Sequence, residues 1–120
     1  MGLSPGFRDR LSGITCAKRV LTEPADTWVY GYDNSRKHAP PDVVVFATSH
    51  REVQDIVRLC HEHGVPIVAR GRGTATTGAA IPVRGGVVLS LERMNRILNV
   101  DPANRVIVVE PGVTNQAVQE

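Results

Sequence analysis

The stretch from Val65 to Pro82 constrains the fold of this chain more than any other part of it. Its first residues, Val65 to Ala69, form an apolar run that predicts a buried parallel strand. The run leads directly into a loop of glycines, small residues and threonines, flanked by Arg70 and Arg72. Glycine permits positive φ and lets a ligand approach the backbone closely. Because successive N–H groups in such a turn form an anion-binding concavity, the loop is predicted to bind a phosphate or pyrophosphate.

Two common phosphate-binding motifs do not describe this loop. A Rossmann fingerprint, G-x-G-x-x-G, would need a third glycine where Thr76 stands. A Walker A loop would need a lysine where Ala79 stands. Pro82 and the Gly85-Gly86 pair also interrupt any long helix after the loop. What remains is a loop that binds through backbone amides and hydroxyls, without help from a following helix.

The same residues carry a family resemblance. The loop matches the pattern A-R-G-x-G-T-x-x-[ST]-G-x-x-x-P at Ala69–Thr74, Thr77-Gly78 and Pro82. In this pattern the chain resembles the FAD-binding domain of the vanillyl-alcohol oxidase superfamily (PCMH-type), in the branch of the glycolate oxidase D-subunit and the D-lactate dehydrogenases. The resemblance covers most of residues 30–120 and continues in Pro41–Val45, Glu52-Val53, Gly86–Ser90, Met94–Ile97 and Glu110–Val113. An isolated G-x-G more often only turns the chain between two strands, but this ordered series favours cofactor binding.

The resemblance implies which residues contact FAD. Backbone N–H groups of Arg70–Ala75 would surround the pyrophosphate, and Thr77 and Gly78 would lie along the diphosphate and ribityl side. Pro111–Val113 would approach the adenine end through backbone atoms. The predicted cofactor-binding residues are therefore Arg70, Gly71, Arg72, Gly73, Thr74, Ala75, Thr77, Gly78, Pro111, Gly112 and Val113. Thr74 stands where some branches carry a histidine that attaches flavin covalently, so FAD is expected to be bound non-covalently.

The side chains of Arg70 and Arg72 have two interpretations that the sequence leaves open. Each guanidinium either faces the phosphates or is solvated surface, as most arginines are. Ala75 and Ala79 stand where glycine is frequent in the relatives, which would make the loop stiffer.

The apolar pattern predicts an α+β fold, in which a small parallel β-α-β sheet covered by helices leads into the start of an antiparallel subdomain. Val43–Phe46 and Gly86–Leu91 are continuous apolar runs, typical of strands that are buried on both faces. Ile97–Val100 and Val106–Val109 flank a polar turn at Asp101–Asn104 and predict a hairpin.

A helix is expected to follow Ser49, whose hydroxyl can accept the Glu52 N–H while the Glu52 side chain reaches back to complete a capping box. Gly64 supplies the residue just past the helix end. The apolar stripe predicted to face the core consists of Val53, Ile56, Val57 and Cys60. Cys60 is therefore expected to be a core residue rather than a nucleophile.

Two domains are expected: residues 1–40 as an N-terminal helix and loop, and residues 41–120 as the N-terminal part of the FAD-binding domain, truncated at its C-terminus. Residues 7–21 are weakly helical, with an apolar side of Phe7, Leu11, Ile14, Val20 and Leu21. Thr22–Pro41 is loop-like. Since a chain that stops at Glu120 ends within a short helix, we expect an exposed apolar face there.

Composition excludes several classes of function. An apolar fraction of 42% with 22% charged residues is that of a globular protein. A net charge of +2 leaves no basic footprint for nucleic acid, and no apolar run approaches the length of a transmembrane segment. Cys16 and Cys60 lack C-x-x-C spacing, which favours free thiols in the cytoplasm. His61 and His63 are interpreted as helix-end residues, so no metal site is predicted.

The resemblance also implies the reaction. The full-length protein would be an FAD-dependent oxidoreductase that oxidises a small 2-hydroxy acid such as glycolate or D-lactate and passes electrons onward, with an electron-transfer partner subunit as one acceptor. Its substrate site and catalytic residues would lie beyond Glu120, so no catalytic residue is predicted here and the chain alone would be inactive. The alternative is a non-enzymatic nucleotide- or phosphate-binding module of the same fold, which a loop without catalytic side chains permits.

Overall fold

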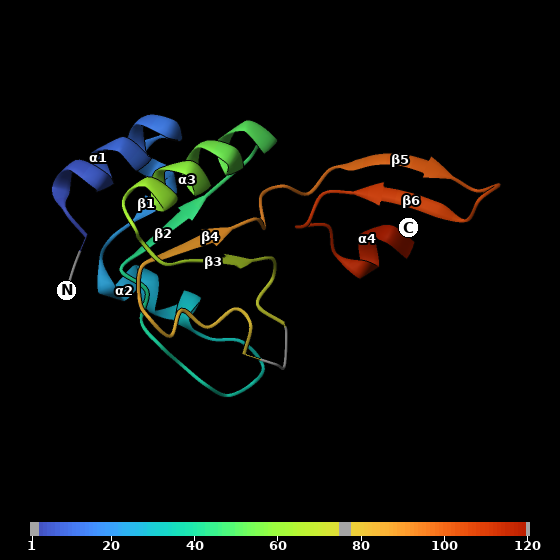
Figure 1. Cartoon of the computed structure of the whole chain (residues 1–120). Coiled ribbons are helices and arrows are strands. Elements are labelled where there is room, and N and C mark those ends of the chain that lie inside the picture. The colour runs from blue at the N-terminus through green and yellow to red at the C-terminus, as the bar shows by residue number, and fades with distance from the viewer. Residues whose placement is uncertain (1–2, 75–77, 120) are drawn as a thin grey trace.

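A four-stranded sheet forms the centre of the fold (Figure 1). The computed structural model describes residues 3–74 and 78–119. The strands of the sheet are β1 (Val20–Leu21), β2 (Val43–Phe46), β3 (Ile67–Arg70) and β4 (Val87–Ser90). They lie in the order β1-β2-β4-β3, with β2, β4 and β3 parallel and β1 antiparallel to β2.

Helices and an N-terminal segment cover the two faces of this sheet. The helices are α1 (Pro5–Ile14), α2 (Pro24–Thr27), α3 (His50–Glu62) and α4 (Asn115–Gln119), with 3-10 turns η1 (Ala17–Arg19) and η2 (Trp28–Gly31). α1 and α3 lie side by side over one face (Figure 1). On the other face, Leu21 and Tyr30 pack on a cluster that includes Phe46. Every residue of β2 and β4 is buried, which confirms the two strands predicted to be covered on both faces.

β3 confirms the β-α-β unit but corrects its details. The sequence predicts a buried strand at Val65–Ala69, whereas β3 begins at Ile67 and its residues are partly or largely exposed. Among the described strands β4 is its only neighbour, so β3 lies at the edge of the sheet. An edge strand leaves one side of its backbone and part of its side chains uncovered. The prediction of complete burial is therefore wrong for this strand.

The start of α3 has only one of the two hydrogen bonds of the predicted capping box. The Ser49 hydroxyl accepts the Glu52 N–H at 3.2 Å, as expected. The Glu52 carboxylate does not reach back to Ser49; it accepts the Thr48 N–H at 2.8 Å and both ends of the Arg19 guanidinium at 2.8 and 2.9 Å. Burial alone would raise the pKa of Glu52, but the hydrogen bonds from Arg19 and Thr48 outweigh it and hold the pKa below its ordinary value.

The buried face of α3 is rotated relative to the predicted stripe. Val57 is 43% exposed, whereas Leu59, which the prediction omits, is buried with Ile56 and Cys60. The cause is α1, since Phe7 belongs to the same core cluster as Leu59 and the two helices are in contact. Burial also raises the pKa of the Cys60 thiol to about 11, as expected of a core cysteine rather than a nucleophile.

The N-terminal segment is more structured than its sequence predicts. α1 ends at Ile14, so Val20 and Leu21 do not continue its apolar side. They form β1 instead, paired with Val45 and Val44 of β2. The expected loop at Thr22–Pro41 contains α2 and η2, and Pro24 occupies the first helical turn, where its fixed φ suits a helix.

A hairpin extends away from the sheet toward the C-terminus (Figure 1). Its antiparallel strands are β5 (Ile97–Asp101) and β6 (Val106–Val109), which confirms the predicted hairpin. The Asp101 carboxylate accepts the Asn104 backbone N–H at 3.3 Å and its side-chain amide at 2.8 Å, which stabilises the turn. Most apolar side chains of the hairpin are exposed, among them Leu98 at 56% and Val100 at 59%.

Candidate functional site

The glycine- and threonine-rich loop begins at the carboxyl edge of the parallel strands. Phe46, Ser90 and Arg70 are register partners and mark the ends of β2, β4 and β3 at this edge. The Leu91 N–H donates to the Arg70 carbonyl at 2.8 Å, so the chains leaving β3 and β4 start out together. Open α/β sheets bind ligands at this edge, beyond the carboxyl ends of their strands.

The loop backbone has the properties of an anion site. Among the described residues, no acceptor is found for the backbone N–H groups of Gly71, Arg72, Gly73 and Thr74. Gly73 and Gly78 have φ values of +71° and +83°, a conformation that glycine adopts without strain. A hollow of about 260 Å³ is lined by Ala69, Gly71, Arg72, Gly73, Thr74, Ala79 and Ala80. Donor groups next to an open hollow are suited to an anionic ligand such as a diphosphate.

The structure brings the second predicted backbone segment against this loop. The Arg72 guanidinium donates to the Gly112 carbonyl from Nε at 3.0 Å and from Nη2 at 2.8 Å. A Cβ built on Gly71 would lie 3.6 Å from the Pro111 carbonyl oxygen. Val113 follows in a turn in which its N–H donates to the Glu110 carbonyl at 3.2 Å. The two stretches, about forty residues apart in the chain, therefore border one site.

Gly112 can occupy its place only because it has no side chain. A Cβ there would lie 2.5 Å from the Leu91 carbonyl oxygen and 2.6 Å from that of Glu92. The Gly112 N–H donates to the Met94 carbonyl at 2.7 Å, which holds the segment against the turn that follows β4. The close approach of two backbones fixes this residue type.

Both arginines of the loop contact other segments of the chain. The Arg72 side chain is exposed and its guanidinium donates to the Gly112 carbonyl. Arg70 donates from Nη1 to the Tyr32 carbonyl, and its guanidinium lies 5.5 Å from the centre of the Tyr30 ring. Both side chains thus connect the loop to other segments of the chain, and the donors without described acceptors are the backbone amides.

The sequence does not single out the polar cluster that adjoins the loop. The Tyr30 hydroxyl donates to the Glu92 carboxylate at 3.0 Å, and the Ser90 hydroxyl donates to the same oxygen at 3.3 Å. Burial, together with the bond to Glu92, raises the pKa of Tyr30 above its ordinary value. Tyr30 also packs on Phe46 and so anchors its segment on the core.

Not every predicted site residue can be placed. Ala75 and Thr77 lie outside the described residues. Thr74 is described, and its carbonyl accepts the side-chain amide of Asn34 at 3.1 Å. Gly78 is described as well, and a Cβ built on it would lie 3.7 Å from the Ser35 hydroxyl. Both contacts involve a segment that the sequence interprets only as loop.

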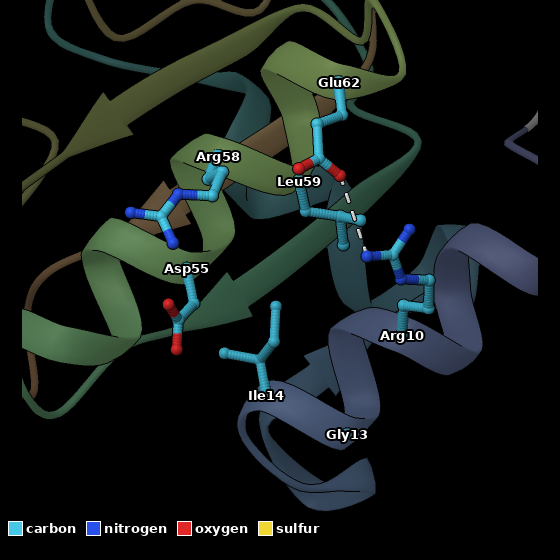
Figure 2. Close-up of a pocket in the computed structure, with 7 residues that line it drawn as sticks. All are labelled: Arg10, Gly13, Ile14, Asp55, Arg58, Leu59 and Glu62. Carbon is cyan, nitrogen blue, oxygen red and sulfur yellow. Dashed lines mark ion pairs between the residues drawn. The ribbon is translucent and has the colours of Figure 1, made fainter.

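A larger hollow, of about 460 Å³, lies between α1 and α3 and has a different character (Figure 2). Figure 2 shows Arg10 of α1 directed toward Glu62 of α3, with a separation of 3.7 Å and both side chains more than half exposed. Asp55 and Arg58 add one charge of each sign to its lining. Opposite charges that offset one another on open helix surfaces provide no preferred ligand, so the loop is the better candidate site.

Two negative findings bear on the site. Within residues 3–74 and 78–119, no group of three or more histidine, cysteine, aspartate or glutamate side chains could hold a metal ion. No helix in that part of the chain is long and apolar enough to cross a membrane.

The fold and the site together define a mixed α/β domain with a candidate anion site at the carboxyl edge of its sheet. The model of the family described as FAD binding domain matches residues 41–120. Since that match covers most of the chain, the protein belongs to this FAD-binding domain family, and FAD is its cofactor.

Sequence identity to three named relatives supports this assignment. The chain is 42% identical to the glycolate oxidase subunit GlcD of Bacillus subtilis over 112 residues, covering 92% of this chain and 24% of the relative. It is 43% identical to a D-lactate dehydrogenase of Anaerostipes hadrus over 75 residues, covering 62% and 16%. A relative from Mycobacterium tuberculosis, 40% identical over 107 residues, is named as an FAD-linked oxidoreductase. The chain spans about a quarter of the length of the curated relatives it matches.

A solved structure confirms the expected fold. p-Cresol methylhydroxylase with bound substrate superposes with a TM-score of 0.81 at 31% identity, covering 98% of this chain and 25% of that one. The mixed α/β architecture is therefore that of the PCMH-type FAD-binding domain, as the resemblance implies.

The described residues fit FAD. A dinucleotide diphosphate needs donors and room for close approach, and the loop supplies N–H groups without described acceptors beside an open hollow. A second backbone segment, at Pro111 and Gly112, lies within reach of the first.

Proposed function

We propose that the loop after β3 and the segment after β6 bind FAD non-covalently through their backbones. Residues Arg70–Thr74 would hold the pyrophosphate, together with Ala75 and Thr77, which lie outside the described residues, and with Gly78. Pro111–Val113 would face the adenine end. The observation that carries this proposal is the set of loop N–H groups for which no acceptor is found among the described residues.

The protein that contains this domain is proposed to oxidise a small 2-hydroxy acid such as glycolate or D-lactate. The relatives named glycolate oxidase subunit GlcD and D-lactate dehydrogenase support this substrate class. The bound flavin supplies the hydride acceptor, and the residues of this chain bind and orient it. The substrate site is proposed to lie outside residues 1–120, because this chain covers only 24% of the glycolate oxidase subunit GlcD of Bacillus subtilis.

Three further assignments belong to the same proposal. Residues 41–120 would form the N-terminal part of the FAD-binding domain, preceded by residues 1–40 as a leading helix and loop. An electron-transfer partner subunit would accept the electrons. The cytoplasm is the proposed location, since free thiols such as the buried Cys60 suit a reducing compartment.

The proposal is tested by FAD binding and turnover in the complete polypeptide. Flavin absorbance of the purified protein is followed after addition of glycolate or D-lactate with an artificial electron acceptor. The flavin is expected to bleach when the acid is added before the acceptor, and turnover is expected once the acceptor is present. Binding of FAD or ADP without any redox activity would instead favour the non-enzymatic nucleotide-binding module.

A pair of variants separates binding from folding. Gly73→Val is expected to weaken FAD binding, because a side chain there crowds the diphosphate and collides with the Arg70 guanidinium. His61→Ala, on the exposed end of α3, is expected to leave binding unchanged. Calorimetric titration measures both dissociation constants, and equal losses in the two variants would contradict a specific role for the loop.

A further inference from the structure

A short segment near the N-terminus, Tyr32–Ser35, lies against the glycine-rich loop at both of its ends. It precedes residues 41–120, which the family model matches, so that match assigns it no role. Its sequence is polar and unremarkable, and only the folded chain brings it to the carboxyl edge of the sheet. Two hydrogen bonds, at Tyr32 and Asn34, and a close approach of Ser35 join it to the loop.

The first two contacts involve the start and the middle of the loop. Arg70, the last residue of β3, donates to the Tyr32 carbonyl. The Asn34 side-chain amide donates to the Thr74 carbonyl at 3.1 Å. Since a carbonyl that is hydrogen-bonded to a fixed partner cannot rotate freely, the Asn34 contact also limits the orientation of the peptide that follows Thr74.

The close approach of Ser35 is to the far end of the loop, where a Cβ built on Gly78 would lie 3.7 Å from the Ser35 hydroxyl oxygen. Asp33 is 8% exposed, and its Oδ1 accepts the Ser35 N–H at 2.8 Å. The Ser35 hydroxyl and N–H, and across the loop the N–H groups of Gly78 and Ala80, hold the pKa of Asp33 below its ordinary value. The bond from the Ser35 N–H to Asp33 fixes the backbone of the segment, and so the position from which Ser35 faces the loop.

We propose that Tyr32–Ser35 is a clamp that holds the loop in its FAD-binding shape, with Asp33 and Asn34 as positioning residues. The inference rests on the proposed FAD contacts of the loop. A loop rich in glycine loses much conformational freedom when it is ordered around a ligand. Contacts that order it beforehand remove that loss from the binding step, and affinity rises without any new contact to the ligand.

The test compares Asn34→Ala and Asp33→Asn with matched controls in the complete polypeptide. Asn34 is exposed, so its truncation leaves the core intact. The Asn34→Ala variant therefore still tests the proposal if Asp33→Asn fails to fold. The controls are Asn99→Ala on the exposed hairpin and Asp9→Asn on the exposed side of α1. The clamp predicts FAD dissociation constants about 5- to 10-fold higher for both test variants, the equivalent of one hydrogen bond, and unchanged values for the controls.

Two further readouts separate positioning from general stability. The urea midpoint of the FAD-free protein should stay within error of wild type for Asn34→Ala. Trypsin should cleave the FAD-free variants after Arg72 several-fold faster than wild type, because the released loop enters the protease more readily. Unchanged FAD affinity together with unchanged cleavage would overturn the clamp, as would a loss of affinity that only follows a loss of stability.

The cleavage assay also distinguishes the two proposals. If wild type binds neither FAD nor ADP, the proposed function fails, yet cleavage after Arg72 still shows whether Asp33 and Asn34 hold the loop. If wild type binds FAD and the variants match it in affinity and in cleavage, the clamp fails and the FAD site stands.

Discussion

Replacing Gly112 by alanine tests the contact between the two backbone segments of the site. The new Cβ would lie 2.5 Å from the Leu91 carbonyl oxygen and 2.6 Å from that of Glu92. Both atoms are backbone, so a side-chain rotation cannot relieve the overlap, and either the turn after β4 or the segment itself must move. Overpacking of this kind costs about 1–3 kcal/mol. The displaced Gly112 carbonyl would also weaken its hydrogen bonds from Arg72.

Thermal unfolding and FAD titration measure the two consequences. With an unfolding entropy of about 2.1 cal/mol/K per residue, each kcal/mol lowers the Tm of a chain of this size by about 4 °C. We therefore expect Gly112→Ala to melt about 4–12 °C below wild type and to bind FAD more weakly.

Gly13→Ala is the matched control for this variant. Gly13 lies in α1, and a Cβ there meets nothing within 4 Å. Because alanine has the higher helix propensity, this variant should be stabilised by about 0.5–1 kcal/mol. A Gly112→Ala protein with wild-type Tm and wild-type FAD affinity would refute the close approach of the two segments.

Three other predictions concern separate parts of the structure. Arg72→Lys replaces a two-bond guanidinium contact on Gly112 by a single ammonium, so titration should show FAD affinity about 3- to 10-fold lower; unchanged affinity would contradict the bridging role. The pKa of Glu52 is depressed on folding, so its stabilising contribution is present above its ordinary pKa and is lost as pH falls through the folded pKa. The Tm difference between wild type and Glu52→Gln should therefore be largest near neutral pH and vanish in acid, and a difference that grows in acid would reverse the assigned sign. Acid denaturation of the FAD-loaded protein should release all flavin into the supernatant, and yellow colour retained on the protein would contradict non-covalent binding.

The parts of the fold that local patterns determine could be predicted from the sequence. Four consecutive apolar residues at Val43–Phe46 can be covered on both faces only in a central strand, and the structure has one there. Ser49 begins α3, and Gly64, with φ of +62°, follows its last turn. In each case the residues that cause the feature are within a few positions of it.

The parts that depend on distant partners could not be predicted. Val20 and Leu21 form a strand only because they pair with β2, which lies some twenty-five residues later in the chain. Leu59 is buried and Val57 is exposed because α1 packs on one side of α3. The position of α1 cannot be predicted from the sequence of α3.

The same division applies to the site. That a glycine-rich loop begins where β3 ends could be predicted, since glycines and threonines directly after an apolar run indicate a turn; its role in binding stays a prediction. The role of Arg72 could not, because its partner is a carbonyl on Gly112, which any residue type would offer. The contacts between the loop and the segment around Asp33 could not be predicted either. They involve backbone atoms of the loop, such as the Thr74 carbonyl that accepts from Asn34.

The most direct test of the central claim is an amide NMR titration of the FAD-free protein with ADP, with adenosine as the control that lacks the diphosphate. If the backbone N–H groups of Gly71–Thr74 bind the linked phosphates, their resonances should move on addition of ADP and stay in place with adenosine. Resonances of Gly71–Thr74 that remain fixed while ADP binds, with shifts confined to other parts of the chain, would contradict the account.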